Sequence, residues 1–247
     1  NNDYGLGFYC TEHKELACEW AVGLGCDGHV NKYILDTNEL NILDLGDNKN
    51  FTALHWLCVL MKNRKFKINQ NITKQIRDYI FDKFSIPLEG VDVIRGWRAD
   101  DRYFAYAKAF LAGALSYKML MKAMILGELG DQVVLKTEQA FEKISFVEEE
   151  VVPATIWYEK KDYRSKHAEK EYKTLLERES DINDITILDI VRAKMSPDAL
   201  RVQEEEFRRA IRGINKKLQQ SDRAKAVNIG EQALFDAAQA VNNRQSA

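Results

Sequence analysis

The stretch that decides the fold is DYGLGFYCTEHKELACEWA, residues 3–21. Gly5 and Gly7 have no side chain, so the backbone at these positions can approach another group closely. Apolar residues at helical spacing run from residue 14 to residue 22. Tyr9, before this helix, and Trp20, on it, supply flat aromatic faces. The pattern fits a planar ligand bound between the two rings, and it also fits an ordinary strand start with both aromatics in the core.

Outward from this stretch, the chain alternates between strand-like and helical patterns. Residues 30–35 and 41–45 alternate as strands, and the polar residues 36–38 between them predict a hairpin turn. Later runs at 91–94, 132–137 and 143–152 also favour strands. Helical spacing predicts helices at 51–61, 73–84, 103–111, 116–126, 159–179 and 182–194. The mixture predicts an α+β fold.

Composition excludes several classes of protein. The 247 residues carry a formal net charge of −2, so no general basic field indicates nucleic-acid binding. No apolar run reaches the roughly 18 residues of a membrane span, and the first residues do not form a secretory signal. Four cysteines favour a reducing compartment, and their spacing lacks the close pairs of a zinc site. We therefore expect a cytoplasmic protein with no membrane contact and no bound metal.

The last fifty residues predict a separate helical tail. Ser196, Pro197 and Asp198 form a helix start, with a capping serine and a proline in the first turn. Apolar residues then follow a coiled-coil-like spacing at Phe207, Ile211, Ile214 and Leu218. This divides the chain into a domain over residues 1–195 and a tail over residues 196–247. The tail is a candidate for self-association or for binding another protein.

Five ordered segments resemble one family. They are the segment from Asp3 to Thr11, the Trp20-Ala21 pair, residues 30–44, the Ala99-Asp100-Asp101 turn, and residues 132–135. Together they resemble DUF3990, a bacterial family within the ADP-ribosyltransferase superfamily, and the glycine-rich segment is similar to that of poly(ADP-ribose) polymerases. The resemblance implies a split β-sheet core with inserted helices, to which this chain adds a helical C-terminal extension.

The resemblance also implies a function and a site. It implies a mono-ADP-ribosyltransferase that uses NAD as co-substrate, releases nicotinamide and modifies a protein or a nucleic acid. Such bacterial proteins resemble toxins or defence effectors, so an antitoxin is an expected partner of the tail. The residues implied to bind NAD are Gly5, Gly7, Phe8, Tyr9, Thr11 and Trp20, and those implied to act in catalysis are Tyr9 and Gln132.

Two departures from the superfamily pattern leave a second function open. The superfamily's first strand carries a His or Arg that holds the adenosine side of NAD, and the chain begins after the place of this strand. We expect that an N-terminal strand of the natural protein is missing. Gln132 stands where the superfamily has a catalytic Glu, and a neutral amide can orient a ribose hydroxyl but supplies no negative charge. The alternative is a weakened or inactive member that binds a nucleotide, ADP-ribose or a protein.

Asp100, Asp101 and Arg98 have two interpretations each, and His55 has one. Asp100 and Asp101 precede a helix, where a side-chain oxygen can cap unpaired backbone N–H groups, but they could also face the substrate. Arg98 could attract a phosphate-bearing substrate or could lie solvated on the surface. His55, on an apolar helix face, is predicted to be a core residue.

Overall fold

The computed structural model describes residues 2–46, 50–64, 74–99, 103–126, 131–177 and 184–209. The chain divides into two compact units, Asn1–Arg201 and Val202–Ala247. The first unit contains both β-sheets. Of the second unit, residues 202–209 are described, and they are helical. No helix of the described residues is long and apolar enough to cross a membrane.

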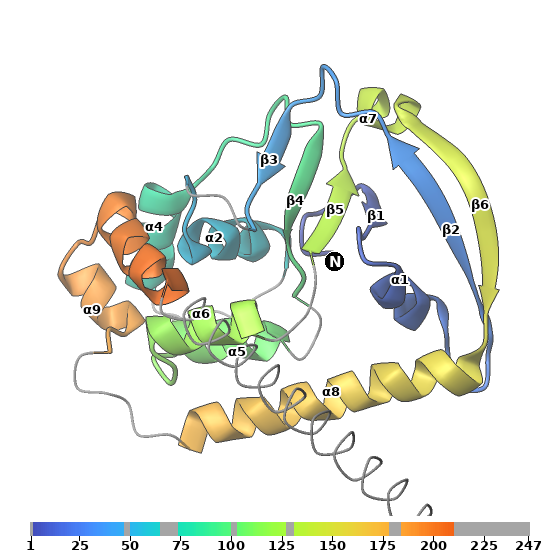
Figure 1. The fold of residues 1–247 in the computed structure, drawn as a ribbon. Helices are drawn as coiled ribbons and strands as arrows, with labels where there is room; N and C mark the ends of the chain where they lie inside the picture. Colours follow the sequence, from blue (N-terminus) through green and yellow to red (C-terminus); the bar gives the residue numbers. More distant parts are fainter. Residues whose placement is uncertain are drawn as a thin grey trace, which may run out of the picture. The chain divides into compact units, whose positions relative to one another are not determined.

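The strands form two separate sheets (Figure 1). The strands are β1 (Phe8–Cys10), β2 (Gly28–Leu35), β3 (Ile42–Asp44), β4 (Val93–Trp97), β5 (Asp131–Leu135) and β6 (Ile144–Val152). Four of them make one sheet in the order β1-β5-β4-β3, in which only the β3–β4 pair is parallel. The long strands β2 and β6 pair antiparallel with each other as a two-stranded ribbon. The predicted mixture of helices and strands is confirmed.

The predicted hairpin at residues 30–45 is wrong. Residues 30–35 lie in β2, which pairs with β6, whereas β3 pairs with β4 in the other sheet. The polar residues 36–38 do form a turn-like segment, in which Asn38 N donates to Asp36 Oδ1 at 3.0 Å. This turn carries the chain from one sheet to the other. Alternation identified both strands but contains no information about their partners.

The helices lie close to their predicted positions, except that the short helix α7 (Glu138–Glu142) was not predicted. They are α1 (Lys14–Ala21), α2 (Ala53–Asn63), α4 (Lys74–Phe84), α5 (Tyr103–Leu111), α6 (Tyr117–Leu126), α7 (Glu138–Glu142), α8 (Ala154–Glu177) and α9 (Ile187–Arg192). Local capping explains several starts: Ser116 Oγ accepts from Met119 N, and Ser196 Oγ accepts from Ala199 N, both at 3.2 Å. The tail helix therefore begins as predicted. Of the proposed tail seam, Phe207 alone falls among the described residues.

Helix α2 forms much of the core and is joined to the four-stranded sheet. Every residue from Ala53 to Leu60 is buried. Trp56 Nε1 donates to the carbonyl oxygen of Trp97, at the end of β4, at 3.0 Å, and the two rings meet edge to face. This contact connects α2 to the strand end that the candidate site uses.

Helix α1 is held between the two-stranded ribbon and α8 (Figure 1). Cys18 of α1 and Val22, directly after α1, pack against Val152 and Ala154, where β6 leads into α8. Glu19, which is 3% exposed, accepts from Arg164 of α8, with Nε 2.9 Å from Oε2. A buried carboxylate needs such a partner, because an unpaired charge away from water is unstable. The ion pair therefore fixes the position of α1 on α8.

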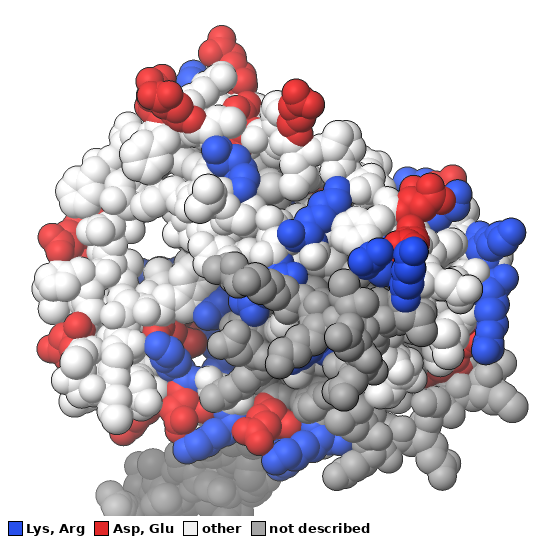
Figure 2. All heavy atoms as spheres, turned by 180° about the vertical axis from the view of Figure 1, so that it is seen from behind, with Lys and Arg blue, Asp and Glu red and all other residues white. Residues whose placement is uncertain are grey.

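Surface charge is mixed. On the face shown in Figure 2, acidic and basic side chains are interspersed with uncharged ones. On the ribbon, Lys32 pairs with Glu148 at 3.0 Å, and Lys14 of α1 pairs with Glu150. Exposed pairs of this kind contribute little to stability, but they balance the acidic run on β6.

His55 gives a testable pH dependence of stability. It is buried, as predicted, and its Nδ1 accepts from Thr52 N at 2.9 Å in the capping box of α2. Burial, and secondarily the charge of Arg201, lowers the pKa of His55 from 6.5 to about 4. Between these values the unfolded chain binds a proton that the folded chain does not, so stability is full above pH 6.5 and falls as the pH drops toward 4.

We expect His55→Gln to remove this part of the pH dependence, because glutamine also completes a capping box and does not titrate. Urea unfolding at pH 7 and pH 4 measures it. The wild-type protein should lose up to about 3 kcal/mol more unfolding free energy than the variant over this interval. Equal losses would mean that His55 is not buried as a neutral group.

Candidate functional site

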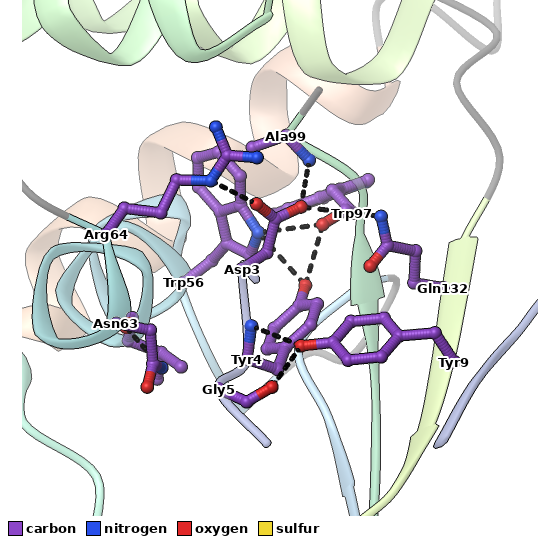
Figure 3. Close-up of polar contacts among 11 residues, drawn as sticks. Asp3, Tyr4, Gly5, Tyr9, Trp56, Asn63, Arg64, Trp97, Ala99 and Gln132 are labelled. Atoms are coloured by element: carbon purple, nitrogen blue, oxygen red, sulfur yellow. Dashed lines mark hydrogen bonds and ion pairs between the residues drawn. The ribbon is translucent and has the colours of Figure 1, made fainter. Parts of the chain in front are cut away.

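The motif turn, residues 3–7, is held against β4, β5 and α2 by hydrogen bonds (Figure 3). Tyr4 is 1% exposed, and its hydroxyl donates to Trp97 O at 2.7 Å and accepts from Trp56 Nε1 at 3.1 Å. Directly after β5, the Lys136 ammonium group donates to Tyr4 O at 2.6 Å and also to Leu6 O. Burial lowers the pKa of Lys136. The first residues of the chain are therefore fixed to the sheet.

Tyr9 lies on β1 with its hydroxyl directed back into the same turn (Figure 3). The hydroxyl donates to Gly5 O at 2.7 Å and accepts from Tyr4 N at 3.1 Å. Burial raises the pKa of Tyr9 to about 12. The hydroxyl is thus a neutral group that closes the turn, and the ring is the part of Tyr9 that remains for a ligand.

The two glycines of the motif lie close to other atoms of the protein. Gly5 has φ +78°, a left-handed conformation that favours glycine, and a Cβ there would lie 2.7 Å from Asn63 Oδ1. At Gly7 a Cβ would lie 2.6 Å from both Leu135 O and Val134 Cγ1 of β5. The close approach predicted for Gly7 is therefore an approach to strand β5.

Phe8 and Thr11 lie apart from Tyr9. Phe8 is next to Tyr9 on a strand and so points to the opposite face of the sheet, where its ring meets Tyr33 and Phe141 edge to face. Thr11 Oγ1 accepts from His13 N at 3.2 Å in the turn before α1. Both residues have partners of their own, so the structure does not bring them together with Tyr9.

Trp20 and Arg98 come together. The Arg98 guanidinium carbon lies 4.7 Å from the centroid of the Trp20 ring, within the range of a cation–π interaction. The Trp20 indole Nε1 is buried and has no hydrogen-bond partner among the described residues. Arg98 is therefore not fully solvated, because its charge lies over an aromatic ring of the predicted site.

Gln132 lies on β5 opposite Gly96 of β4 and is 6% exposed. Its amide Nε2 donates to Asp3 Oδ2 at 3.4 Å (Figure 3). Its Oε1 is buried and has no hydrogen-bond partner within the described parts of the chain. Gln132 therefore offers one buried acceptor.

Asp3 joins these residues, and sequence reasoning assigned it no role. The carboxylate is 4% exposed, forms an ion pair with Arg64 (Nε to Oδ1, 2.7 Å) and accepts from Ala99 N at 2.7 Å. Burial raises its pKa, while the Ala99 N–H and the charges of Arg64 and Arg98 oppose this rise. Asp3 is the first residue of the glycine-rich motif, and this position could have drawn attention to it. Nothing in the sequence pointed to Arg64.

Asp100 and Asp101, the predicted caps or substrate-facing residues, lie outside the described residues. The described site therefore consists of Trp20, Arg98, Asp3 and Gln132, with the Tyr9 ring on the same sheet face as Gln132. It contains a buried indole N–H, a buried amide oxygen, a guanidinium and a carboxylate. This set can bind a polar ligand that carries both donors and acceptors and has a flat ring.

A comparison with protein families assigns the chain to one of them. The fold is mixed α/β, and its candidate site lies where the ends of β4 and β5 meet the motif turn. The model of the family DUF3990, described as a protein of unknown function, matches residues 1–146. The chain belongs to this family. Searches of curated proteins and of solved structures gave no match.

Gly7→Ala tests the fit of the motif turn on β5. The added methyl group would meet backbone and side-chain atoms of β5 at 2.6 Å, so we expect a loss of about 1–3 kcal/mol in unfolding free energy. Gly23→Ala is the matched control, because its methyl group would meet Cys26 Cβ at an ordinary 3.5 Å. Urea unfolding of both variants measures the difference, and equal stability would show that the turn does not lie against β5.

Proposed function

We propose that the protein is an NAD-dependent mono-ADP-ribosyltransferase that releases nicotinamide and transfers ADP-ribose to a macromolecule. One observation supports this most. Two buried polar groups without partners among the described residues, Trp20 Nε1 and Gln132 Oε1, are linked through Arg98 and Asp3. A buried donor or acceptor left unpaired costs about 1–3 kcal/mol, which a ligand with matching groups would recover.

The NAD molecule offers those groups. Its nicotinamide is a flat ring that can stack on an indole, its ribose hydroxyls can donate to an amide oxygen, and its phosphates are attracted to a guanidinium. In the reaction, the bond between ribose and nicotinamide breaks with its electron pair leaving on nicotinamide, and a nucleophile of the acceptor bonds to the ribose carbon. The proposed place in the ADP-ribosyltransferase superfamily rests on the resemblance of the glycine-rich segment. The division of the strands into two sheets is consistent with the split β-sheet that this resemblance implies.

Trp20→Ala tests the ring contact. We expect nicotinamide release from NAD to fall about tenfold or more, since ring stacking of about 1.4 kcal/mol corresponds to a factor of ten. Chromatography of nicotinamide after incubation with NAD measures it.

Trp157→Ala is the matched control for the loss of a tryptophan. Trp157 is also partly buried and also has a cation over its ring, with Lys160 Nζ 4.3 Å from the centroid, but it lies on α8 against Cys18 and Val152. It should retain most of the activity. Urea unfolding of both variants checks that each is folded under the assay conditions. Similar losses of activity in two folded variants would contradict a nicotinamide site at Trp20.

A second function is favoured by one observation, the neutral amide at position 132. A site with a neutral amide at this position could bind ADP-ribose or a nucleotide and leave NAD intact. Calorimetry with NAD and with ADP-ribose, together with the nicotinamide assay, separates the two functions. Binding of both ligands without cleavage would favour the binding module.

The acceptor is proposed as a class only. The interspersed charge in Figure 2 gives no reason to prefer a nucleic acid over a protein. Incubation with labelled NAD and fractionated bacterial lysate shows whether label enters protein, RNA or DNA. A role as a toxin or defence effector is supported if expression of the wild-type protein arrests bacterial growth and expression of the Trp20→Ala variant does not. The 196–247 tail is the proposed binding site for an antitoxin.

A further inference from the structure

We propose that Asp3 is a positioning residue: it holds the Gln132 amide in one orientation, with Nε2 toward Asp3 and Oε1 presented to a ligand hydroxyl. The part that concerns the ligand rests on the proposed function. The part that concerns the Asp3–Gln132 pair rests on the structure of the free protein.

The Asp3 carboxylate is fixed from two directions. Arg64, after the end of α2, pairs with Oδ1, and the backbone N–H of Ala99, after the end of β4, donates to Oδ2, each at 2.7 Å. The Ala99 N–H can only donate, so it holds Oδ2 as an acceptor, and the positive charge of Arg64 beside Oδ1 favours the ionised carboxylate. Oδ2 can therefore interact with Gln132 only as an acceptor.

This decides which end of the amide faces Asp3. The oxygen and nitrogen ends of a glutamine amide have the same shape, and hydrogen-bond partners select between them. An oxygen at 3.4 Å from Asp3 Oδ2 would place two acceptors together, whereas the nitrogen donates. The Gln132 Oε1 must then point away from Asp3, where it is buried and has no partner in the described parts of the chain.

The orientation selects the chemistry of the ligand. An amide oxygen only accepts, so the group that it binds must be a donor, such as a sugar hydroxyl, and a phosphate or carboxylate oxygen is excluded from this position. The Asp3 charge lies one hydrogen bond behind Gln132 and also disfavours an anion there. A ligand carbon that gains positive charge during bond cleavage would be tolerated.

A consequence is that a glutamate at position 132 does not fit this site as it stands. In Gln132→Glu, two carboxylates would face each other near 3.4 Å with no donor between them, so one must take up a proton or move away. We expect the variant to release nicotinamide about tenfold more slowly than wild type at neutral pH, because both changes take the acceptor out of position. The double variant Asp3→Asn, Gln132→Glu restores one donor facing one acceptor and should recover at least part of this loss.

Side-chain NMR tests the pair without any ligand. In protein carrying ¹⁵N-labelled glutamine, Gln132→Met assigns the Gln132 amide by the loss of its signals. We expect one of its protons to be shifted downfield and protected from exchange with water in wild type, and Asp3→Asn to remove the shift. Glu19→Gln is the matched control, because it changes another buried carboxylate paired with an arginine but does not touch Gln132.

The outcomes separate the two proposals. A Gln132 amide that exchanges as fast as an exposed one, or a Gln132→Glu variant more active than wild type, overturns the positioning role of Asp3. The positioning role is supported if one wild-type Gln132 amide proton is shifted downfield and protected, and if the double variant releases nicotinamide faster than Gln132→Glu. These two results suffice even if Asp3→Asn alone is too unstable to measure. If wild type neither binds nor cleaves NAD, the proposed function fails, and the amide signals still decide whether Asp3 orients Gln132.

Discussion

The burial of the Asp3 carboxylate is the constraint on which the site depends. A charge that is 4% exposed is stable only with partners, and those of Asp3 come from three distant parts of the chain. Arg64 follows α2, Ala99 follows β4, and Gln132 lies on β5. Satisfying one carboxylate therefore brings the end of a helix, the end of a strand and the first turn of the protein to one point.

In this structure, the residues of the family motif mainly hold the turn of residues 3–7 against the four-stranded sheet. The hydroxyls of Tyr4 and Tyr9 are both engaged, one with Trp97 and one with Gly5, and the missing Cβ of Gly7 makes room for β5. The polar groups left without partners among the described residues are on other elements, at Trp20 and Gln132. The motif therefore builds the wall of the site, and the ligand-facing groups come from α1 and β5.

The sequence predicted what is local and missed what is distant. Helix starts at Thr52, Ser116 and Ser196 were predictable, because each cap involves residues within three positions of the cap. The hairpin prediction failed because β2 pairs with a strand more than a hundred residues later in the chain. Asp3 escaped notice for the same reason: its bonds to Ala99 and Gln132 span 96 and 129 residues. A single sequence contains no direct signal for such pairs.

The site also depends on a helix beyond the segment that matches the family. The family match ends at residue 146, inside β6, and α8 begins at Ala154. Yet α8 supplies Arg164 to the buried Glu19, and its Lys161 donates to Val22 O at 2.9 Å, so both contacts hold α1 from the same side. Trp20 follows Glu19 on that helix. Because removing one partner of a buried ion pair leaves an uncompensated charge, α8 is part of what places the Trp20 ring over the site. The part of the chain that forms the candidate site therefore extends at least through α8, beyond the segment that matches the family.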